Sequence, residues 1–313
     1  MSCGRRCGRA ATCRGRFRHA QRVRPEQVLE RLGGVADAAT LLEHVPRWKI
    51  ASAVKRGELV RLERGRYALP GLDDALAAAH RLSGLLCEDS AVRFYGWPLK
   101  RQPSTPAVVV PRKRNLSQSR RRGVRVRFVD VPPYDVNRVA TTPLRTVLDC
   151  ASRLPFDEAL AVADSALRCR DVSQERLIER ARAMPPRYRA RCLRVAEAAD
   201  ARAANPFESV LRAIALDVPG LSVEPQVWVG DIGRPDLGDE RLRIVVEADS
   251  FEFHGRRHAL AQDCMRYNAF VVDGWIVVRF AWEHVMFQPV YVRRVLTSAV
   301  EQALARRRGR RAV

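Results

Sequence analysis

The sequence lacks any long hydrophobic run. Its most apolar stretches, such as Ile244–Val246 and Ile276–Val278, are interrupted within a few residues, whereas a helix that crosses a bilayer needs about 18 consecutive apolar residues. The Arg-rich first residues are also not followed by the apolar segment of a signal peptide. These absences argue against a membrane-spanning or exported chain, and we expect a cytoplasmic protein with no membrane partner.

Cysteine is too scarce and too scattered for a disulfide scaffold, with 8 Cys in 313 residues. Five of them stand apart in apolar or helical patterns: Cys87, Cys150, Cys169, Cys192 and Cys264. We predict that these are small core residues in a reducing compartment. Cys3, Cys7 and Cys13 lie closer together, but they lack a fourth ligand and a tight CxxC pair. They therefore favour a disordered basic leader over a zinc site.

Acidic residues are absent from three segments of the chain. Residues 1–24 hold eight Arg, residues 111–128 hold eight Arg and Lys, and residues 306–313 hold five Arg, which together equal the formal charge of +21. Such polybasic segments are typical of nucleic-acid contacts or of solvated tails. We predict that the internal block contacts nucleic acid through Arg112, Lys113, Arg114, Arg120, Arg121 and Arg122.

The remaining composition is that of a globular protein with more than one domain. Hydrophobic residues make up 47% of the chain, which is enough to form packed cores and excludes wholesale disorder. A length of 313 residues leaves room for two or three domains. We expect a mixed α/β and α+β protein.

Residues 25–70 have the pattern of three short helices followed by a hairpin. A Gly pair ends the first helix, Asp37 caps the second, and Pro46 opens the third. The third helix is predicted to turn Ile50, Ala51 and Val54 toward the core. This order predicts a winged helix-turn-helix, whose third helix enters the major groove and whose hairpin touches phosphates. The predicted DNA contacts are Trp48, Lys49, Ser52, Lys55, Arg56, Arg64 and Arg66. The same fold can instead serve as a protein-docking module.

Three short motifs follow the hairpin: Leu85–Val92 (LLCEDSAV), Tyr95–Trp97 (YGW) and Thr141–Asp149 (TTPLRTVLD). With the winged helix, they resemble the AbiEi family of antitoxins over about residues 25–170. The resemblance implies a winged helix that binds promoter DNA, and a following domain that supports repression and neutralises a nucleotidyltransferase toxin. Within the third motif, Thr142 and Pro143 predict a helix start, and Arg145 and Asp149 predict a structural i, i+4 pair. Residues 150–205 are predicted to be helical.

From Asn205 onward the sequence predicts the order αβββαβ, with the strand that bears Glu247 central. Glu247 and Asp249 are two residues apart, so their side chains lie on the same face of that strand. If the preceding loop centres near Arg241 and Leu242, Asp236 lies opposite Glu247 and three carboxylates meet. If the loop centres on Asp239, the cluster fails. Clustered carboxylates need a shared proton or a cation, and oxygen ligands favour Mg²⁺ or Mn²⁺.

Residues 205–304 resemble the PD-(D/E)XK nuclease superfamily, in the branch of the very-short-patch mismatch repair endonucleases. The motifs are Arg234-Pro235-Asp236, Glu247-Ala248-Asp249, the helical Glu208, His254, the pair Asp263 and Arg266, and the closing strand from Gly274 to Phe280. The resemblance implies Mg²⁺-dependent cleavage of double-stranded DNA. Asp236 and Glu247 would hold the metal, with the carbonyl of Ala248 as a third ligand. Asp249 and Glu208 would act through water, His254 would help to activate that water, and Arg266 would contact phosphate.

One departure favours a competing hypothesis. The superfamily usually has Lys at the position of Asp249, and a carboxylate cannot stabilise developing negative charge as a cation does. The alternative is a non-catalytic repressor or antitoxin that keeps the nuclease fold as a binding platform. Whichever hypothesis holds, the sequence also leaves open that His254 is a simple loop residue and that Asp263 and Arg266, at i, i+3, form an ordinary helix pair.

Other features of the sequence point to no further chemistry. Trp275, Phe280 and Trp282 are predicted to be core residues. RNA is a less favoured substrate because no RNA-binding motif occurs, and no heptad pattern indicates an oligomer. The predicted organisation is a disordered basic leader (1–24), a winged helix-turn-helix (25–70), an AbiEi-like α+β domain (71–170), a helical bridge (171–204), a restriction-endonuclease-like domain (205–304) and a basic tail (305–313).

Overall fold

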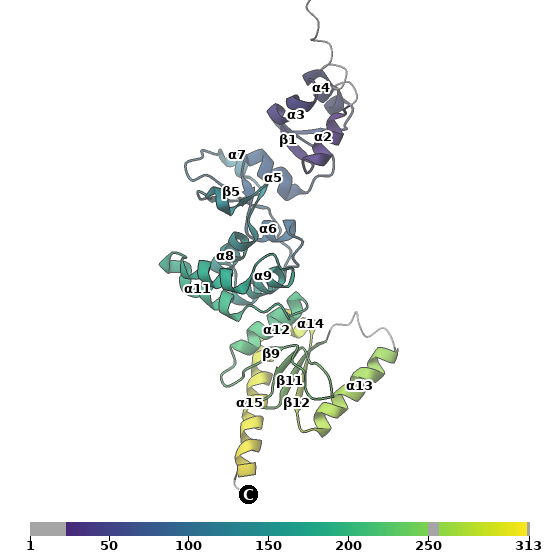
Figure 1. Cartoon of the computed structure of the whole chain (residues 1–313), viewed down its shortest axis with the longest axis vertical. Coiled ribbons are helices and arrows are strands. Elements are labelled where there is room, and N and C mark those ends of the chain that lie inside the picture. Colours follow the sequence, from purple (N-terminus) through teal and green to yellow (C-terminus); the bar gives the residue numbers. More distant parts are fainter. Residues whose placement is uncertain (1–22, 250–256, 312–313) are drawn as a thin grey trace, which may run out of the picture. The chain divides into compact units, whose positions relative to one another are not determined.

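The computed structural model describes residues 23–249 and 257–311. Within these residues no helix is long and apolar enough to cross a membrane. Helices and several sheets alternate along the chain, which confirms the mixed α/β prediction (Figure 1). The chain forms two compact units, the first comprising residues up to 86 together with 105–130, and the second residues 87–104 together with 131–313. This division differs from the predicted boundaries, because residues 71–170 contribute to both units.

The first unit begins with three helices and a small antiparallel sheet. The elements are α2 (Pro25–Arg31), β1 (Val35–Asp37), α3 (Ala38–His44), α4 (Arg47–Lys55), β2 (Val60–Glu63) and β3 (Arg66–Ala68), with the sheet order β1-β3-β2. Asp37 caps α3 as predicted, because its Oδ1 accepts a hydrogen bond from Thr40 N at 2.8 Å. The three-residue strand β1 was not predicted, since its pattern is too short to recognise.

The inward face of α4 differs from the prediction. Ile50 and Ala53 are buried, whereas Ala51 is exposed and Val54 is half-buried. Ile50 and Ala53 are spaced i, i+3, which fits helical periodicity as well as the predicted set does. The packing of α4 against α2 decides which of the two faces is buried. The prediction for Ala51 was therefore wrong.

The rest of the first unit is a second small sheet with two helices. Its elements are α5 (Asp74–Leu82), β4 (Leu85–Leu86), β5 (Ala107–Val110), α7 (Gln118–Arg121) and β6 (Arg125–Phe128). Strand β5 is entirely buried and pairs antiparallel with β4 and parallel with β6. Strand β6 has the sequence RVRF, in which arginines of the basic block alternate with apolar residues, and all four residues are half-buried.

The second unit opens with a helical bundle. Its elements are α6 (Glu88–Phe94), the 3-10 helix η1 (Pro133–Asp135), the strands β7 (Val136–Asn137) and β8 (Ala140–Thr141), and the helices α8 (Pro143–Arg153), α9 (Phe156–Arg168), α10 (Gln174–Arg182) and α11 (Pro186–Ala198). The predicted pair within α8 is present, with Arg145 Nε donating to Asp149 Oδ1 at 2.8 Å. Trp97 anchors the same bundle by donating from Nε1 to Asp171 Oδ2 at 2.8 Å.

The second unit ends with a four-stranded sheet flanked by helices. The elements are α12 (Pro206–Leu216), β9 (Glu224–Pro225), β10 (Leu237–Asp239), β11 (Ile244–Asp249), α13 (Arg257–Val272), β12 (Ile276–Ala281), α14 (Trp282–Phe287) and α15 (Pro289–Arg311), and the sheet order is β12-β11-β10-β9. Through β12 this is the predicted order of elements, and β11, which carries Glu247, is interior as predicted. Figure 1 shows α15 and α13 on opposite sides of the parallel strands β11 and β12.

The two faces of β11 belong to different cores. Ile244 and Val246 pack with α12 and α15, whereas Val245 packs with Phe270 of α13 and with Trp275. Because side chains alternate along a strand, Glu247 and Asp249 lie on the face of Val245, toward α13.

Helix α12 joins the helical bundle to this sheet. Its Arg212 donates from Nη2 to both carboxylate oxygens of Asp164 on α9, each at 2.7 Å. The side chain of Arg212 is 4% exposed and that of Asp164 is fully buried. Ala213 of the same helix belongs to the core of the bundle, while Leu211 belongs to the core of the sheet. The bundle and the sheet therefore share one helix.

The cysteines and aromatic residues correct two predictions. Cys87, Cys150 and Cys192 are buried, but Cys169 and Cys264 are exposed. Burial raises the pKa of the Cys192 thiol to about 11. Trp275 and Phe280 are core residues as predicted. Trp282 is 41% exposed instead, because β12 ends before it and α14 begins there.

The shared helix gives a first prediction. Among the described residues Arg212 is the ionic partner of the buried Asp164 carboxylate. Replacing Arg212 with Met leaves that carboxylate unpaired, and we expect a loss of about 3 to 5 kcal/mol in the free energy of unfolding. The double variant Arg212→Met with Asp164→Leu removes both charges and should recover most of that loss. Urea unfolding followed by circular dichroism measures both variants. A single variant as stable as the wild type would show that this ion pair does not hold the bundle to the sheet.

Candidate functional site

The register of the hairpin β10–β11 brings Asp236 opposite Glu247. Leu237 pairs with Val246 and Asp239 pairs with Ile244, so the next pair outward is Asp236 with Glu247. The turn therefore centres between residues 241 and 242, which is the first of the two alternatives that the sequence left open. Two carboxyl groups from neighbouring strands thus meet at one edge of the sheet.

Glu247 is buried and only partly compensated. Its side chain is 4% exposed, its Oε1 has no hydrogen-bond partner, and Arg266 Nη2 lies 3.5 Å from that oxygen. Burial, and then the charge of Asp236, raise the pKa of Glu247 to about 8, while Arg266 opposes the shift. Near neutral pH, Glu247 therefore retains a proton in most molecules unless a cation replaces it.

Asp236 is held by two hydrogen bonds from the chain. Its Oδ2 accepts from the backbone N of Ala248 at 2.8 Å, and its Oδ1 accepts from Nε2 of Gln226 at 3.1 Å. Burial is the main reason that the pKa of Asp236 is raised. Gln226 adopts a left-handed backbone conformation with φ of 55°, which is uncommon for a residue other than glycine. The chain thus accepts local strain at the residue that orients Asp236.

Glu208 reaches the cluster indirectly. Its Oε1 accepts from Asn205 Nδ2 at 2.9 Å, and its Oε2 accepts from Ala204 N at 2.9 Å and from Gln226 Nε2 at 3.1 Å. Asn205 Oδ1 in turn accepts from Glu208 N at 3.0 Å, a reciprocal cap at the start of α12. Glu208 therefore positions Gln226, and through it Asp236.

Asp249 is paired with a cation from the adjacent strand. Arg279 Nε donates to Asp249 Oδ2 at 2.8 Å, and the hydroxyl of Tyr267 lies 3.4 Å from Oδ1. The guanidinium of Arg279 lies over the Tyr267 ring at 3.9 Å from its centroid. Arg266 forms the predicted helix pair with Asp263 at 3.3 Å and also faces Glu247.

The structure thus brings five of the six predicted catalytic residues to one edge of the sheet: Asp236, Glu247, Asp249, Glu208 and Arg266. His254 lies outside the described residues. Gln226, Tyr267 and Arg279 also belong to the cluster, although none of the three was predicted as a site residue. Gln226 lies in an irregular loop with no motif. Arg279 lies on the predicted closing strand, but its place beside Glu247 comes from the strand register in the structure.

The donor set of this edge fits a hard divalent cation. Within the described residues, no three His, Cys, Asp or Glu side chains stand together as a complete metal site. Mg²⁺, however, commonly takes only one or two carboxylates and keeps several waters. Asp236 and Glu247 supply oxygen donors, and the buried Oε1 of Glu247 lacks a hydrogen-bond partner.

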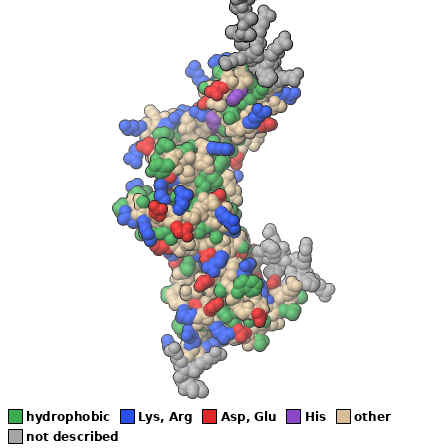
Figure 2. Space-filling model, viewed as in Figure 1, with side chains coloured by type: hydrophobic (Ala, Val, Ile, Leu, Met, Phe, Trp, Pro, Cys, Tyr) green, Lys and Arg blue, Asp and Glu red, His purple; other side chains and the backbone are tan. Residues whose placement is uncertain are grey.

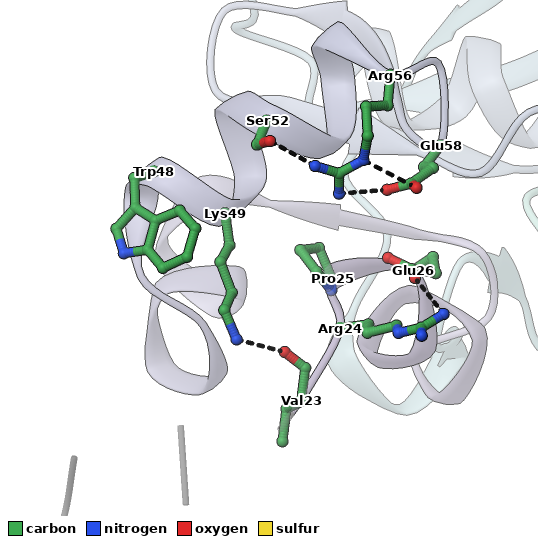
Figure 3. A pocket seen from close by; sticks show the side chains of 9 residues that line it. All are labelled: Val23, Arg24, Pro25, Glu26, Trp48, Lys49, Ser52, Arg56 and Glu58. Carbon is green, nitrogen blue, oxygen red and sulfur yellow. Dashed lines mark hydrogen bonds and ion pairs between the residues drawn. The ribbon is translucent and has the colours of Figure 1, made fainter. Parts of the chain in front are cut away.

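A different surface lies on α4 of the first unit (Figure 3). Trp48 is 65% exposed, and Lys49 Nζ donates to the backbone O of Val23 at 3.3 Å. Arg56 donates to Glu58 through Nε at 2.9 Å and through Nη2 at 2.6 Å, and it also contacts Ser52. These side chains line a cavity of about 340 Å³. Lys55 of the same helix is exposed.

The remaining predicted DNA contacts fall into two groups. The exposed ones are Arg64, Arg112, Lys113, Arg121 and Arg122, and Arg114 is half-buried. Figure 2 shows Lys and Arg side chains on the surface of this part of the first unit.

Arg66 and Arg120 instead make contacts within the chain. Arg66 Nη1 lies 2.7 Å from His80 Nδ1, and its Nη2 donates to Ser83 Oγ at 2.6 Å. Arg120 Nε donates to Glu63 Oε1 at 3.0 Å. These two arginines fasten the β2–β3 hairpin to α5 with the residue that follows it and to α7.

Comparison with known proteins supports one of the two resemblances. Residues 82–197 match the family model described as the AbiEi antitoxin C-terminal domain, which confirms the AbiEi-like part, although over later residues than predicted. Two proteins of Mycobacterium tuberculosis named as uncharacterized, MT2308 and Rv2248, are each 28% identical over 259 residues, covering 78% of this chain and 93% of theirs. A crystal structure of the RV2827C protein from the same species is 20% identical, covers 65% of this chain and 83% of its own, and has a TM-score of 0.33.

The buried carboxyl of Glu247 gives a pH prediction. Its pKa rises from 4.5 to about 8 on folding, so between these values the folded protein holds a proton that the unfolded chain releases. Its stabilising contribution is complete below about pH 4.5 and is lost as the pH rises through about 8. Glu247→Gln should remove this part of the pH dependence, as measured by thermal unfolding across that range. Parallel stability profiles of the two proteins would contradict the assignment.

Proposed function

We propose that this protein is a DNA-binding regulator of the toxin–antitoxin type. The observation that carries the proposal is the match of residues 82–197 to the AbiEi antitoxin C-terminal domain. The preceding residues support it, since α2, α3 and α4 followed by the β2–β3 hairpin have the order of a winged helix-turn-helix, with β1 as a third strand.

In this proposal α4 enters the major groove and the hairpin follows the phosphates. Lys55 lies exposed on α4, and Arg64 lies exposed at the turn of the hairpin. Arg56 is already engaged by Glu58, and Arg66 by His80 and Ser83. Lys55 and Arg64 are therefore better placed to meet DNA than two of the arginines first assigned to that role.

The family match also suggests a protein partner. The resemblance to the AbiEi antitoxins implies that this domain neutralises a nucleotidyltransferase toxin. Residues 82–197 are the part that would bind the toxin. A cytoplasmic complex of toxin, regulator and double-stranded promoter DNA is consistent with this role.

The DNA-binding prediction is that Lys55→Ala and Arg64→Ala each weaken binding to DNA from upstream of the protein's own gene. Loss of one phosphate contact should also lower the slope of log affinity against log salt concentration by about 0.9. Fluorescence anisotropy across a salt series measures both effects. Arg187→Ala is the matched control, because Arg187 is an exposed arginine on α11 outside the proposed interface. Unchanged affinity in both variants would rule out α4 and the hairpin as the DNA-binding surface.

A second candidate function is Mg²⁺-dependent hydrolysis of a DNA phosphodiester. It is favoured by the carboxyl pair of Asp236 and Glu247, whose raised pKa values indicate a site that a cation would stabilise. Mg²⁺ or Mn²⁺ bound there would polarise the phosphodiester. Asp236 and Glu247 would hold the ion, Gln226 would orient Asp236, and Arg266 would contact phosphate. The predicted role of His254 in activating water belongs to the same proposal.

Incubation with supercoiled plasmid tests this second function. We expect nicking by the wild type in Mg²⁺ or Mn²⁺ and none by Glu247→Ala or Asp236→Ala, with DNA affinity retained in all. Glu240→Ala is the matched control, because Glu240 lies exposed in the turn of the same hairpin. Absence of nicking by the wild type would remove the hydrolytic function for this substrate and leave the regulator.

A further inference from the structure

We propose that Arg279, held by Asp249 and stacked on Tyr267, is a binding site for a backbone phosphate of DNA. The inference rests on the proposed DNA binding, but it does not require cleavage. It adds to the second unit a DNA contact that the basic segments of the sequence did not indicate.

Three elements fix the position of the Arg279 guanidinium. Strand β12 places Arg279 in register beside Glu247, on the face of the sheet that α13 covers. Asp249 on β11 accepts from Nε at 2.8 Å, and the ring of Tyr267 on α13 lies under the guanidinium at 3.9 Å. A side chain with many rotamers is thereby fixed before any ligand arrives, which lowers the entropy cost of binding.

The atoms left over are those that recognise phosphate. The hydrogen bond that this guanidinium makes within the described residues uses Nε, and among these residues neither Nη atom makes one. The side chain is 38% exposed. Two Nη groups in one plane match two oxygens of a phosphate, a geometry that a single ammonium cannot supply. Asp249 is itself compensated by this pair, so it does not repel the approaching anion with an unpaired charge.

A second arginine of the same sheet shows the contrast. Arg243 precedes β11 at its opposite end, pairs with Asp273 and stacks on Trp275 at 5.4 Å. Its Nη2 donates both to Asp273 Oδ2 and to Asp273 O, each at 2.6 Å. Nη2 of Arg243 is therefore occupied by the chain, whereas within the described residues neither Nη atom of Arg279 makes a hydrogen bond. Arg243 has a similar exposure, 43%, and is the matched control.

The test compares the full-length wild type with Arg279→Gln and Arg243→Gln in binding to a long duplex, in EDTA and across a salt series. We expect Arg279→Gln to lose roughly tenfold in affinity and to lower the salt slope by about 0.9, while Arg243→Gln changes neither. Arg279→Lys keeps the charge beside Asp249 and should recover only part of the loss, because the fork is missing. It also guards against misfolding of the Gln variant, and thermal unfolding of each protein checks this directly.

The outcomes separate this inference from the proposed functions. Equal DNA affinity of Arg279→Gln and Arg243→Gln overturns the phosphate site, even if the plasmid is nicked. A specific loss in Arg279→Gln supports the site, even if no variant nicks the plasmid. Full recovery of DNA affinity by Arg279→Lys would overturn the two-point contact of the Nη groups with phosphate, because a single positive charge would then be sufficient. No binding of DNA by the wild type overturns the phosphate site together with the regulator.

Discussion

Helix α12 is the constraint on which the second unit depends. Arg212 binds the buried Asp164 of the helical bundle, and one turn earlier Glu208 binds Gln226 beside the acidic edge of the sheet. A buried ion pair stabilises little in itself, but breaking it leaves an uncompensated charge, so the two partners stay together. Helix α12 thus positions both the helical bundle, which belongs to the family match, and the carboxyl cluster. A substitution that shifts α12 in the bundle should also shift Glu208 at the carboxyl cluster.

At the acidic edge, burial and charge oppose each other. Asp236 and Glu247 cannot both ionise at low cost where water is largely excluded, and Glu247 responds with a pKa of about 8. A proton or a cation resolves the same conflict, so one arrangement is compatible with a resting regulator and with a hydrolytic site. Asp249 differs from these two, because Arg279 compensates it across the strand pair.

The count of cationic residues overstates the area available for DNA. In a chain with a formal charge of +21, several guanidiniums serve the fold: Arg56 binds Glu58, Arg66 binds His80 and Ser83, and Arg120 binds Glu63. Each of these bonds engages guanidinium donors that could otherwise contact DNA. The basic surface that remains consists of the Lys and Arg side chains that are exposed in the folded protein, and the sequence alone does not show which these are.

The sequence by itself determined the features that depend on local periodicity. Strand alternation put Glu247 and Asp249 on one face, Asp37 marked a helix start, and the order of elements from Asn205 to β12 followed from apolar patterns. Only the tertiary structure decided the pairing of Asp236, the buried face of α4, and the roles of Gln226 and Arg279. These depend on hairpin register, on a left-handed loop residue and on contacts between strands distant in sequence. The energies that choose among such alternatives arise only when the chain is packed.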